Sequence, residues 1–173
     1  KSYKVLLSFS EEGGMTGHAQ GERTDTLSEG MNSALPCQLY VLNKDTGELA
    51  GEEFSKEVES CKVDTKPSEG SQKMEYVEPV YNESFPNAAY VSDINYVSDS
   101  GTNDIQWTLT MKNGDTIFLS TRLTIEKQPA VSYYAEDTPM ETTEELNALL
   151  ASIEEEASAD TPVYLHLPAV TYD

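Results

Sequence analysis

Alternating apolar and polar side chains dominate the segment from residue 105 to residue 126. A period of two places one set on the buried face of a β-strand and the other set on its exposed face. Asn113-Gly114 interrupts the alternation, and this dipeptide is typical of two-residue type I′ hairpin turns. We therefore predict a β-hairpin whose inward-facing residues are Ile105, Trp107, Leu109, Met111, Ile117, Leu119, Leu123 and Ile125.

A helical spacing of apolar residues appears only near the C-terminal end. Positions i, i+3, i+4 and i+7 form one stripe, made by Leu146, Leu149, Leu150 and Ile153. Thr142 and Glu145 precede this stripe with the T-x-x-E spacing of a capping box. Strand-like runs at 130–135 and 163–167 flank the predicted helix, so we expect it to be a crossover that makes these two strands parallel.

Further strand-like runs occur at 3–9, 38–42 and 88–97, whereas residues 52–60 fit either a short helix or a polar strand. Many strands with one clear helix predict an α+β fold that is mainly antiparallel β. We expect a sandwich-like fold or a single curved sheet, with one amphipathic helix near the C-terminus. A chain of 173 residues without an internal repeat favours a single β-rich domain over residues 1–173.

The charge of the chain excludes several kinds of partner. Its 31 acidic and 11 basic residues give a formal net charge of −20, which would repel the phosphates of nucleic acids. The acidity is concentrated near the C-terminal end, because residues 128–173 contain no Lys or Arg. Their ten acidic residues are Glu136, Asp137, Glu141, Glu144, Glu145, Glu154, Glu155, Glu156, Asp160 and Asp173. We also find no apolar run near 18 residues, so we predict no transmembrane helix.

The two cysteines bear on the cellular compartment. Cys37 and Cys61 form no C-x-x-C pair, and in an oxidising compartment they could close one disulfide loop. The alternative is a pair of buried thiols in a reduced protein. We favour the disulfide, because the chain begins at Lys1 without Met and its loops are rich in small polar residues. We therefore expect a processed extracytoplasmic protein, secreted or anchored at the cell surface in the manner of a lipoprotein.

Residues suited to catalysis are scarce. The two histidines, His18 and His166, are far apart in the chain, and His18 lies in a glycine-rich segment that lacks the rigid helical face of a metal motif. Neither a nucleophile elbow nor a P-loop motif is present. Carboxylates such as Asp99 and Asp104 could form a hydrolase pair, but pairs of this kind arise readily among so many acids. We therefore predict no enzymatic activity and no cofactor.

The stretch 99–104 is also rich in oxygen ligands of the kind that calcium prefers. It lacks the spacing of an EF-hand loop, and we favour an ordinary hairpin loop between Val97 and Ile105.

Aromatic and acidic side chains supply the candidate binding residues. Exposed tyrosines provide contact area for sugars or proteins at a low entropic cost. Tyr164 and His166 share the outward face of the last strand, and we expect one of the adjacent Tyr133 and Tyr134 to be exposed. An alternative is that the tyrosines replace scarce aliphatic residues in the core. The candidate binding residues are Tyr90, Tyr134, Tyr164, His166, Glu144, Glu145 and Glu154.

We expect a non-catalytic extracytoplasmic domain that binds a protein or a glycan. The alternative is an acidic inhibitor or immunity-type protein that neutralises a basic partner, and a carboxylate-dependent hydrolase is the least favoured hypothesis. None of these three hypotheses includes a cofactor. The acidic segment distinguishes the first two hypotheses, because electrostatic binding to a basic partner weakens steeply with salt.

Overall fold

The computed structural model describes residues 2–9, 22–81, 88–156 and 163–173. The chain divides into two compact units, Lys1–Glu126 and Lys127–Asp173, which we call the sandwich and the C-terminal unit. The expected single domain over residues 1–173 stays a prediction, since a compact unit need not unfold separately from its neighbour. His18 lies outside the described residues.

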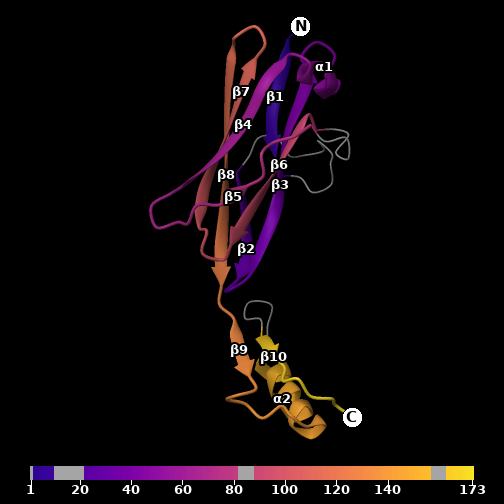
Figure 1. Cartoon of the computed structure of the whole chain (residues 1–173), viewed down its shortest axis with the longest axis vertical. Helices are drawn as coiled ribbons and strands as arrows, with labels where there is room; N and C mark the ends of the chain where they lie inside the picture. Colours follow the sequence, from indigo (N-terminus) through magenta and orange to yellow (C-terminus); the bar gives the residue numbers. More distant parts are fainter. Residues whose placement is uncertain (1, 10–21, 82–87, 157–162) are drawn as a thin grey trace. The chain divides into compact units, whose positions relative to one another are not determined.

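The sandwich consists of two four-stranded sheets (Figure 1). The strand order is β1-β3-β6-β5 in the first sheet and β2-β8-β7-β4 in the second. Its elements are β1 (Tyr3–Ser8), β2 (Arg23–Ser28), β3 (Asn32–Asn43), α1 (Gly51–Ser55), β4 (Val58–Pro67), β5 (Glu75–Tyr76), β6 (Tyr90–Val97), β7 (Thr102–Met111) and β8 (Thr116–Gln128). The pairs β1–β3, β3–β6, β5–β6, β4–β7 and β7–β8 are antiparallel. The predicted class, mainly antiparallel and sandwich-like, is confirmed.

The core of the sandwich contains side chains from both sheets. Trp107 on β7 is fully buried, in one cluster with Leu39 of β3 and Ile94 of β6. Along β7, buried and half-buried residues alternate from Thr102 to Thr110, as the sequence pattern predicts. The period of two therefore selects the buried face correctly.

The turn of the β7–β8 hairpin differs from the predicted type I′ turn. Gly114 has φ +93°, but no residue other than glycine has a positive φ in the described chain, so Asn113 cannot occupy a type I′ position. The Gly114 amide donates to the Met111 carbonyl at 2.9 Å, and the Met111 amide donates to the Asp115 carbonyl at 2.8 Å. These bonds indicate a longer turn in which only the glycine is left-handed, and the Asn113 side chain accepts from the Asp115 amide at 2.9 Å.

The predicted hairpin loop between Val97 and Ile105 is wrong. Strand β6 ends at Val97 in the first sheet, and β7 begins at Thr102 in the second, so residues 98–101 connect the two sheets. Gly101 has φ +59°, and the Ser100 hydroxyl accepts from the Val97 amide at 2.9 Å. A left-handed glycine and a side chain that bonds the backbone make this tight corner possible.

The C-terminal unit is a β–α–β element, made of β9 (Val131–Tyr134), α2 (Thr143–Glu156) and β10 (Val163–His166). Strands β9 and β10 pair in parallel, which confirms the predicted crossover. The capping box is also present, because the Glu145 amide donates to Thr142 Oγ1 at 3.2 Å and the Thr142 amide to Glu145 Oε2 at 3.3 Å. Of the predicted apolar stripe, Leu149 is buried, whereas Leu150 is 43% exposed.

Candidate functional site

Three of the predicted binding residues meet on one face of the two-stranded sheet in the C-terminal unit. His166 is the register partner of Tyr134, and Tyr164 is the partner of Ser132. Since successive side chains of a strand point to opposite faces, all four residues share one face. We call this surface, made of Ser132, Tyr134, Tyr164 and His166, the aromatic face.

The centre of the aromatic face is a stacked pair of rings. The rings of Tyr134 and His166 are nearly parallel, with an interplanar angle of 7° and 4.2 Å between their centroids. Tyr134 is 49% exposed, His166 is exposed and Tyr164 is half-buried. The stack fixes both rings against each other while leaving polar atoms and ring surface in contact with solvent, so little side-chain freedom remains to be lost on binding.

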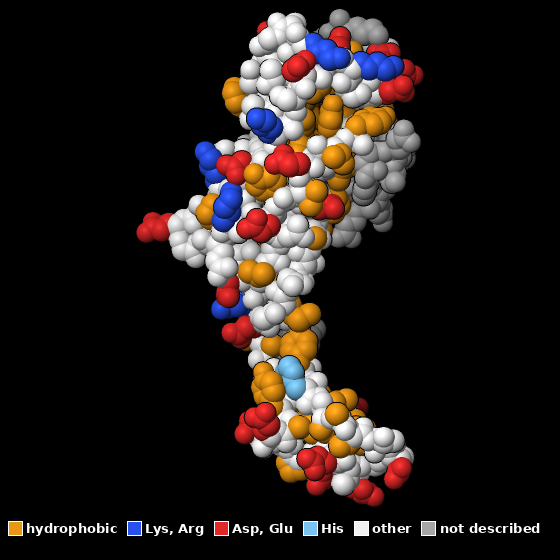
Figure 2. Space-filling view, viewed as in Figure 1, with side chains coloured by type: hydrophobic (Ala, Val, Ile, Leu, Met, Phe, Trp, Pro, Cys, Tyr) orange, Lys and Arg blue, Asp and Glu red, His pale blue; other side chains and the backbone are white. Residues whose placement is uncertain are grey.

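The predicted acidic residues lie on α2 of the same unit, but they are not equivalent. Glu144 and Glu154 are exposed. The Glu145 carboxylate instead accepts hydrogen bonds from the amides of Glu141 and Thr142, so it serves the helix N-terminus. On the face seen in Figure 2, acidic side chains surround the end of the C-terminal unit with no Lys or Arg among them.

Tyr90 belongs to the sandwich and is not on the aromatic face. It is half-buried at the start of β6, and its ring meets that of Tyr81 edge-to-face, with 6.5 Å between centroids. Burial raises the pKa of the Tyr90 hydroxyl above its usual value, and the nearby Cys61 adds to this effect. The position of Tyr90 is therefore consistent with the alternative considered from the sequence, in which a tyrosine contributes to core packing.

The predicted disulfide is wrong, because Cys37 and Cys61 are both free thiols. Cys37 lies on β3 of the first sheet and Cys61 on β4 of the second. Burial raises the pKa of Cys37 to about 12, an effect that a contact with the Trp107 indole partly opposes. Burial, together with the charge of Glu78, raises the pKa of Cys61 to about 12. Both groups are therefore protonated thiols at neutral pH and poor nucleophiles.

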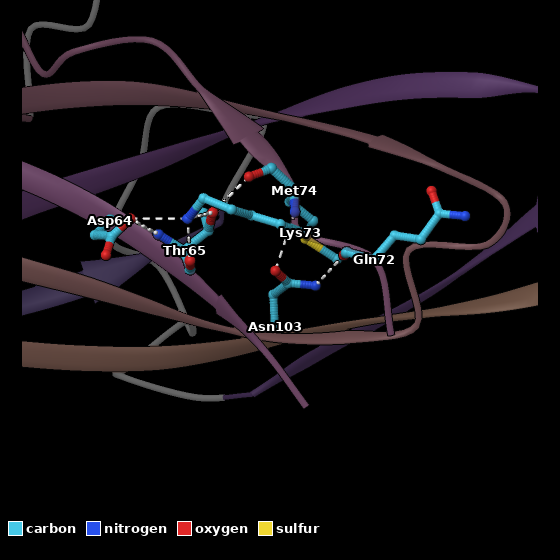
Figure 3. A network of polar contacts seen from close by, with 6 residues as sticks. All are labelled: Asp64, Thr65, Gln72, Lys73, Met74 and Asn103. Atoms are coloured by element: carbon cyan, nitrogen blue, oxygen red, sulfur yellow. Dashed lines mark hydrogen bonds and ion pairs between the residues drawn. The ribbon is translucent and has the colours of Figure 1, made fainter. Parts of the chain in front are cut away.

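A network of polar contacts that the sequence did not reveal lies in the sandwich (Figure 3). Lys73 donates to Asp64 Oδ1 at 2.8 Å, to Thr65 Oγ1 at 3.0 Å and to the Thr65 carbonyl. The hydrogen bond from Lys73 lowers the pKa of the Asp64 carboxyl below its usual value. The Thr65 hydroxyl in turn donates to the Met74 carbonyl. The network ties the segment after β4 back to that strand.

Asn103 completes this network from β7 and is fully buried. Its Oδ1 accepts from the Met74 amide at 3.0 Å, and its Nδ2 donates to the carbonyls of Gln72 at 2.9 Å and Ser100 at 3.1 Å. The sequence did offer one signal, since Asn103 is in phase with Ile105 and Trp107 on the inward side of the strand. A polar residue at an inward position needs partners, and here it finds them in loop backbone.

The stretch 99–104 shows no sign of a metal site. Asp104 is bound to Arg122, with 2.9 Å between Oδ1 and Nε. Across the described ranges, no group of three or more His, Cys, Asp or Glu side chains is arranged to hold a metal ion. Likewise, none of the described helices is long and apolar enough to cross a membrane.

Comparison with known proteins identifies no family. No family model matches the chain, and no curated protein matches it. Among solved structures, the chain is similar to CopC from Methylosinus trichosporium OB3b, with 10% identity, a TM-score of 0.31 and coverage of 61% of this chain and 86% of CopC.

Two enzymes also show similarity. One is a 2,6-sialyltransferase from Photobacterium sp. JT-ISH-224, at 12% identity and a TM-score of 0.27, over 88% of this chain and 29% of that one. The other is a family 123 glycoside hydrolase from Clostridium perfringens, at 8% identity and a TM-score of 0.28, over 92% and 37%. At these TM-scores, none of the three similarities supports a functional inference.

Proposed function

We propose that this chain is a non-catalytic extracytoplasmic binding module that holds a glycan or protein ligand on the aromatic face. The observation that carries the proposal is the exposed, stacked pair of Tyr134 and His166, which is in register across β9 and β10. Aromatic rings that are held in place before binding offer apolar surface to sugar rings or protein side chains, together with hydrogen-bonding tips.

The surroundings favour a ligand without strong negative charge. Residues 128–173 contain ten acidic residues and no Lys or Arg, so an anionic ligand would be repelled. A neutral glycan or a protein surface with a basic rim meets no such barrier. The extracytoplasmic location is part of the same proposal and rests on composition, since the free thiols remove the disulfide as support.

A basic protein partner for α2 is the second candidate function. The exposed carboxylates of Glu144 and Glu154, with no basic residue in the last turn of the helix, favour it. Such a partner would bind through long-range attraction, so its affinity would fall steeply as the salt concentration rises.

The two candidates are separated by one binding experiment with the full chain. The chain is applied to an array of glycans and proteins, alongside Tyr134→Ala, Tyr164→Ala and the charge-reversed pair Glu144→Lys with Glu154→Lys. We expect each tyrosine variant to lose about tenfold in affinity for the bound ligand, a typical cost of truncating an aromatic contact.

Phe118→Ala is the matched control, because Phe118 is a 75% exposed aromatic residue in the sandwich. This variant should bind as the unchanged chain does. If only the charge-reversed variant loses binding and the affinity falls with salt, the acidic surface of α2 is the site and the aromatic face is not.

A further inference from the structure

The sandwich contains a second feature with the character of a binding site, a cavity of about 610 Å³ that is open to solvent. Its wall comes from the start of β3, the end of β6, the short strand β5 and the segment before β5. The polar side chains that line it include Asn32, Gln72, Lys73, Glu75 and Asn95. Its volume falls within the range of about 300–1,000 Å³ typical of small-molecule sites.

Three of these side chains are amides with unused hydrogen-bonding capacity. These three side chains, Asn32, Gln72 and Asn95, are exposed to solvent, and within the described ranges none of them has a protein partner. In Figure 3 the Gln72 amide points away from the network that surrounds its backbone. Each amide offers two N–H donors and a carbonyl acceptor, so the cavity wall presents donors and acceptors side by side.

The segment that carries Gln72 is held in place before any ligand arrives. Asn103 bonds the Gln72 carbonyl and the Met74 amide, and the Ser71 hydroxyl accepts from the Thr102 amide at 2.9 Å. These contacts use backbone atoms and the side chains of Asn103 and Ser71, which leaves the Gln72 amide available. A wall fixed in this way loses little conformational entropy when it binds.

The charges around the cavity argue against an ionic ligand. Lys73 is the cation in the wall, and its ammonium group is bonded to the Asp64 carboxylate at 2.8 Å. Glu75 is a single carboxylate, which is too few hard ligands for a calcium or magnesium ion. The wall presents polar and apolar surface in similar amounts. A neutral ligand with many hydroxyl groups satisfies all of these constraints.

We propose that this cavity binds a neutral saccharide through the amides of Asn32, Gln72 and Asn95, with the carboxylate of Glu75 accepting from a sugar hydroxyl. This site lies in the sandwich and is independent of the aromatic face in the C-terminal unit. A chain with both sites would contact carbohydrate at two places.

The experiment is an NMR titration of the full chain, uniformly labelled with ¹⁵N, in which the side-chain amide signals are followed. The probes are glucose, galactose, N-acetylglucosamine and a β-linked disaccharide of each, with inorganic phosphate and calcium chloride as ionic counterparts. We expect at least one saccharide to shift the side-chain amide signals of Asn32, Gln72 and Asn95 in a saturable manner, and neither ionic probe to do so.

Variants then test the assignment. Gln72→Ala and Asn95→Ala should each weaken saccharide binding about fivefold to tenfold, the loss expected for one or two neutral hydrogen bonds. Asn147→Ala, which removes an exposed amide of α2, should bind as the unchanged chain does. The Trp107 emission of each variant verifies that the sandwich is folded.

Three results would overturn the proposal. One is that no saccharide of the panel shifts these amide signals, and another is that folded Gln72→Ala and Asn95→Ala bind as tightly as Asn147→Ala. The third is that only phosphate or calcium shifts the signals. Tyr134→Ala should leave the amide shifts unchanged, so failure at this cavity is distinguishable from failure at the aromatic face.

Discussion

Replacing Asn103 by Ala should destabilise the sandwich more than any other change of a single polar side chain discussed above. The fully buried amide makes three hydrogen bonds, to the Met74 amide and to the carbonyls of Gln72 and Ser100. With a net value of about 1 kcal/mol per hydrogen bond, the three together contribute about 3 kcal/mol. For a unit that spans Lys1–Glu126, this loss corresponds to a decrease of about 10 °C in Tm.

Urea denaturation measures this loss directly. Trp107 is the single tryptophan of the chain and is buried in the sandwich core, so its fluorescence reports the unfolding of that unit. Gln106→Ala is the control, because Gln106 precedes Trp107 on the same strand but is half-buried on the outward side. We expect the control to change the free energy of unfolding by less than about 0.5 kcal/mol. If Asn103→Ala costs no more than this control, the network does not hold the loop and the reasoning is refuted.

Three further outcomes follow from the structure. Because burial raises the pKa of Cys37 and Cys61 to about 12, a thiol reagent at pH 8 should modify the folded chain at least tenfold more slowly than the urea-unfolded chain. Equal rates of modification would contradict the burial of these thiols. Because the pKa of Asp64 is lowered in the folded chain, the ion pair with Lys73 stabilises the fold above the ordinary pKa of the carboxyl, and this stability is lost as the pH falls through the lower folded value. In urea titrations from pH 6 to pH 2, the free energy of unfolding of Lys73→Met should therefore be closest to that of the unchanged chain at the acidic end, and a difference that is constant with pH would argue against the ion pair. Thr142→Ala removes the cap of α2 and should lower the free energy of unfolding, followed by circular dichroism at 222 nm, by about 1 kcal/mol. If the chain unfolds as a single domain, tryptophan fluorescence should show the same decrease, whereas separately unfolding units predict no change in the fluorescence transition.

The parts of the fold that the sequence predicts are those decided by neighbouring residues. The alternation around Trp107 and the capping box at Thr142 are local patterns, and both appear in the structure. The alternation of β10 also places Tyr164 and His166 together on one face, to which the parallel register adds Tyr134.

The parts that the sequence does not predict depend on contacts between distant residues. The corner at residues 98–101 has the composition of a hairpin loop, and only the pairing of the flanking strands assigns those strands to different sheets. Two of the three partners of Asn103, Gln72 and Met74, lie about 30 residues away in the chain, so no local sequence pattern connects them with Asn103. Cys37 and Cys61 illustrate the same limit, because spacing alone cannot place two strands in different sheets.

The most direct test of the claim that the aromatic face is the binding site is to map where a ligand contacts the chain. The soluble glycan or protein that gives the strongest signal on the array is titrated into the labelled full chain, and the ring signals of His166, Tyr134 and Tyr164 are followed by NMR. We predict saturable shifts of these ring signals that disappear in Tyr134→Ala, with little dependence on salt. Saturable binding that leaves all three rings unshifted and moves only signals of α2 would contradict the assignment of the aromatic face as the binding site.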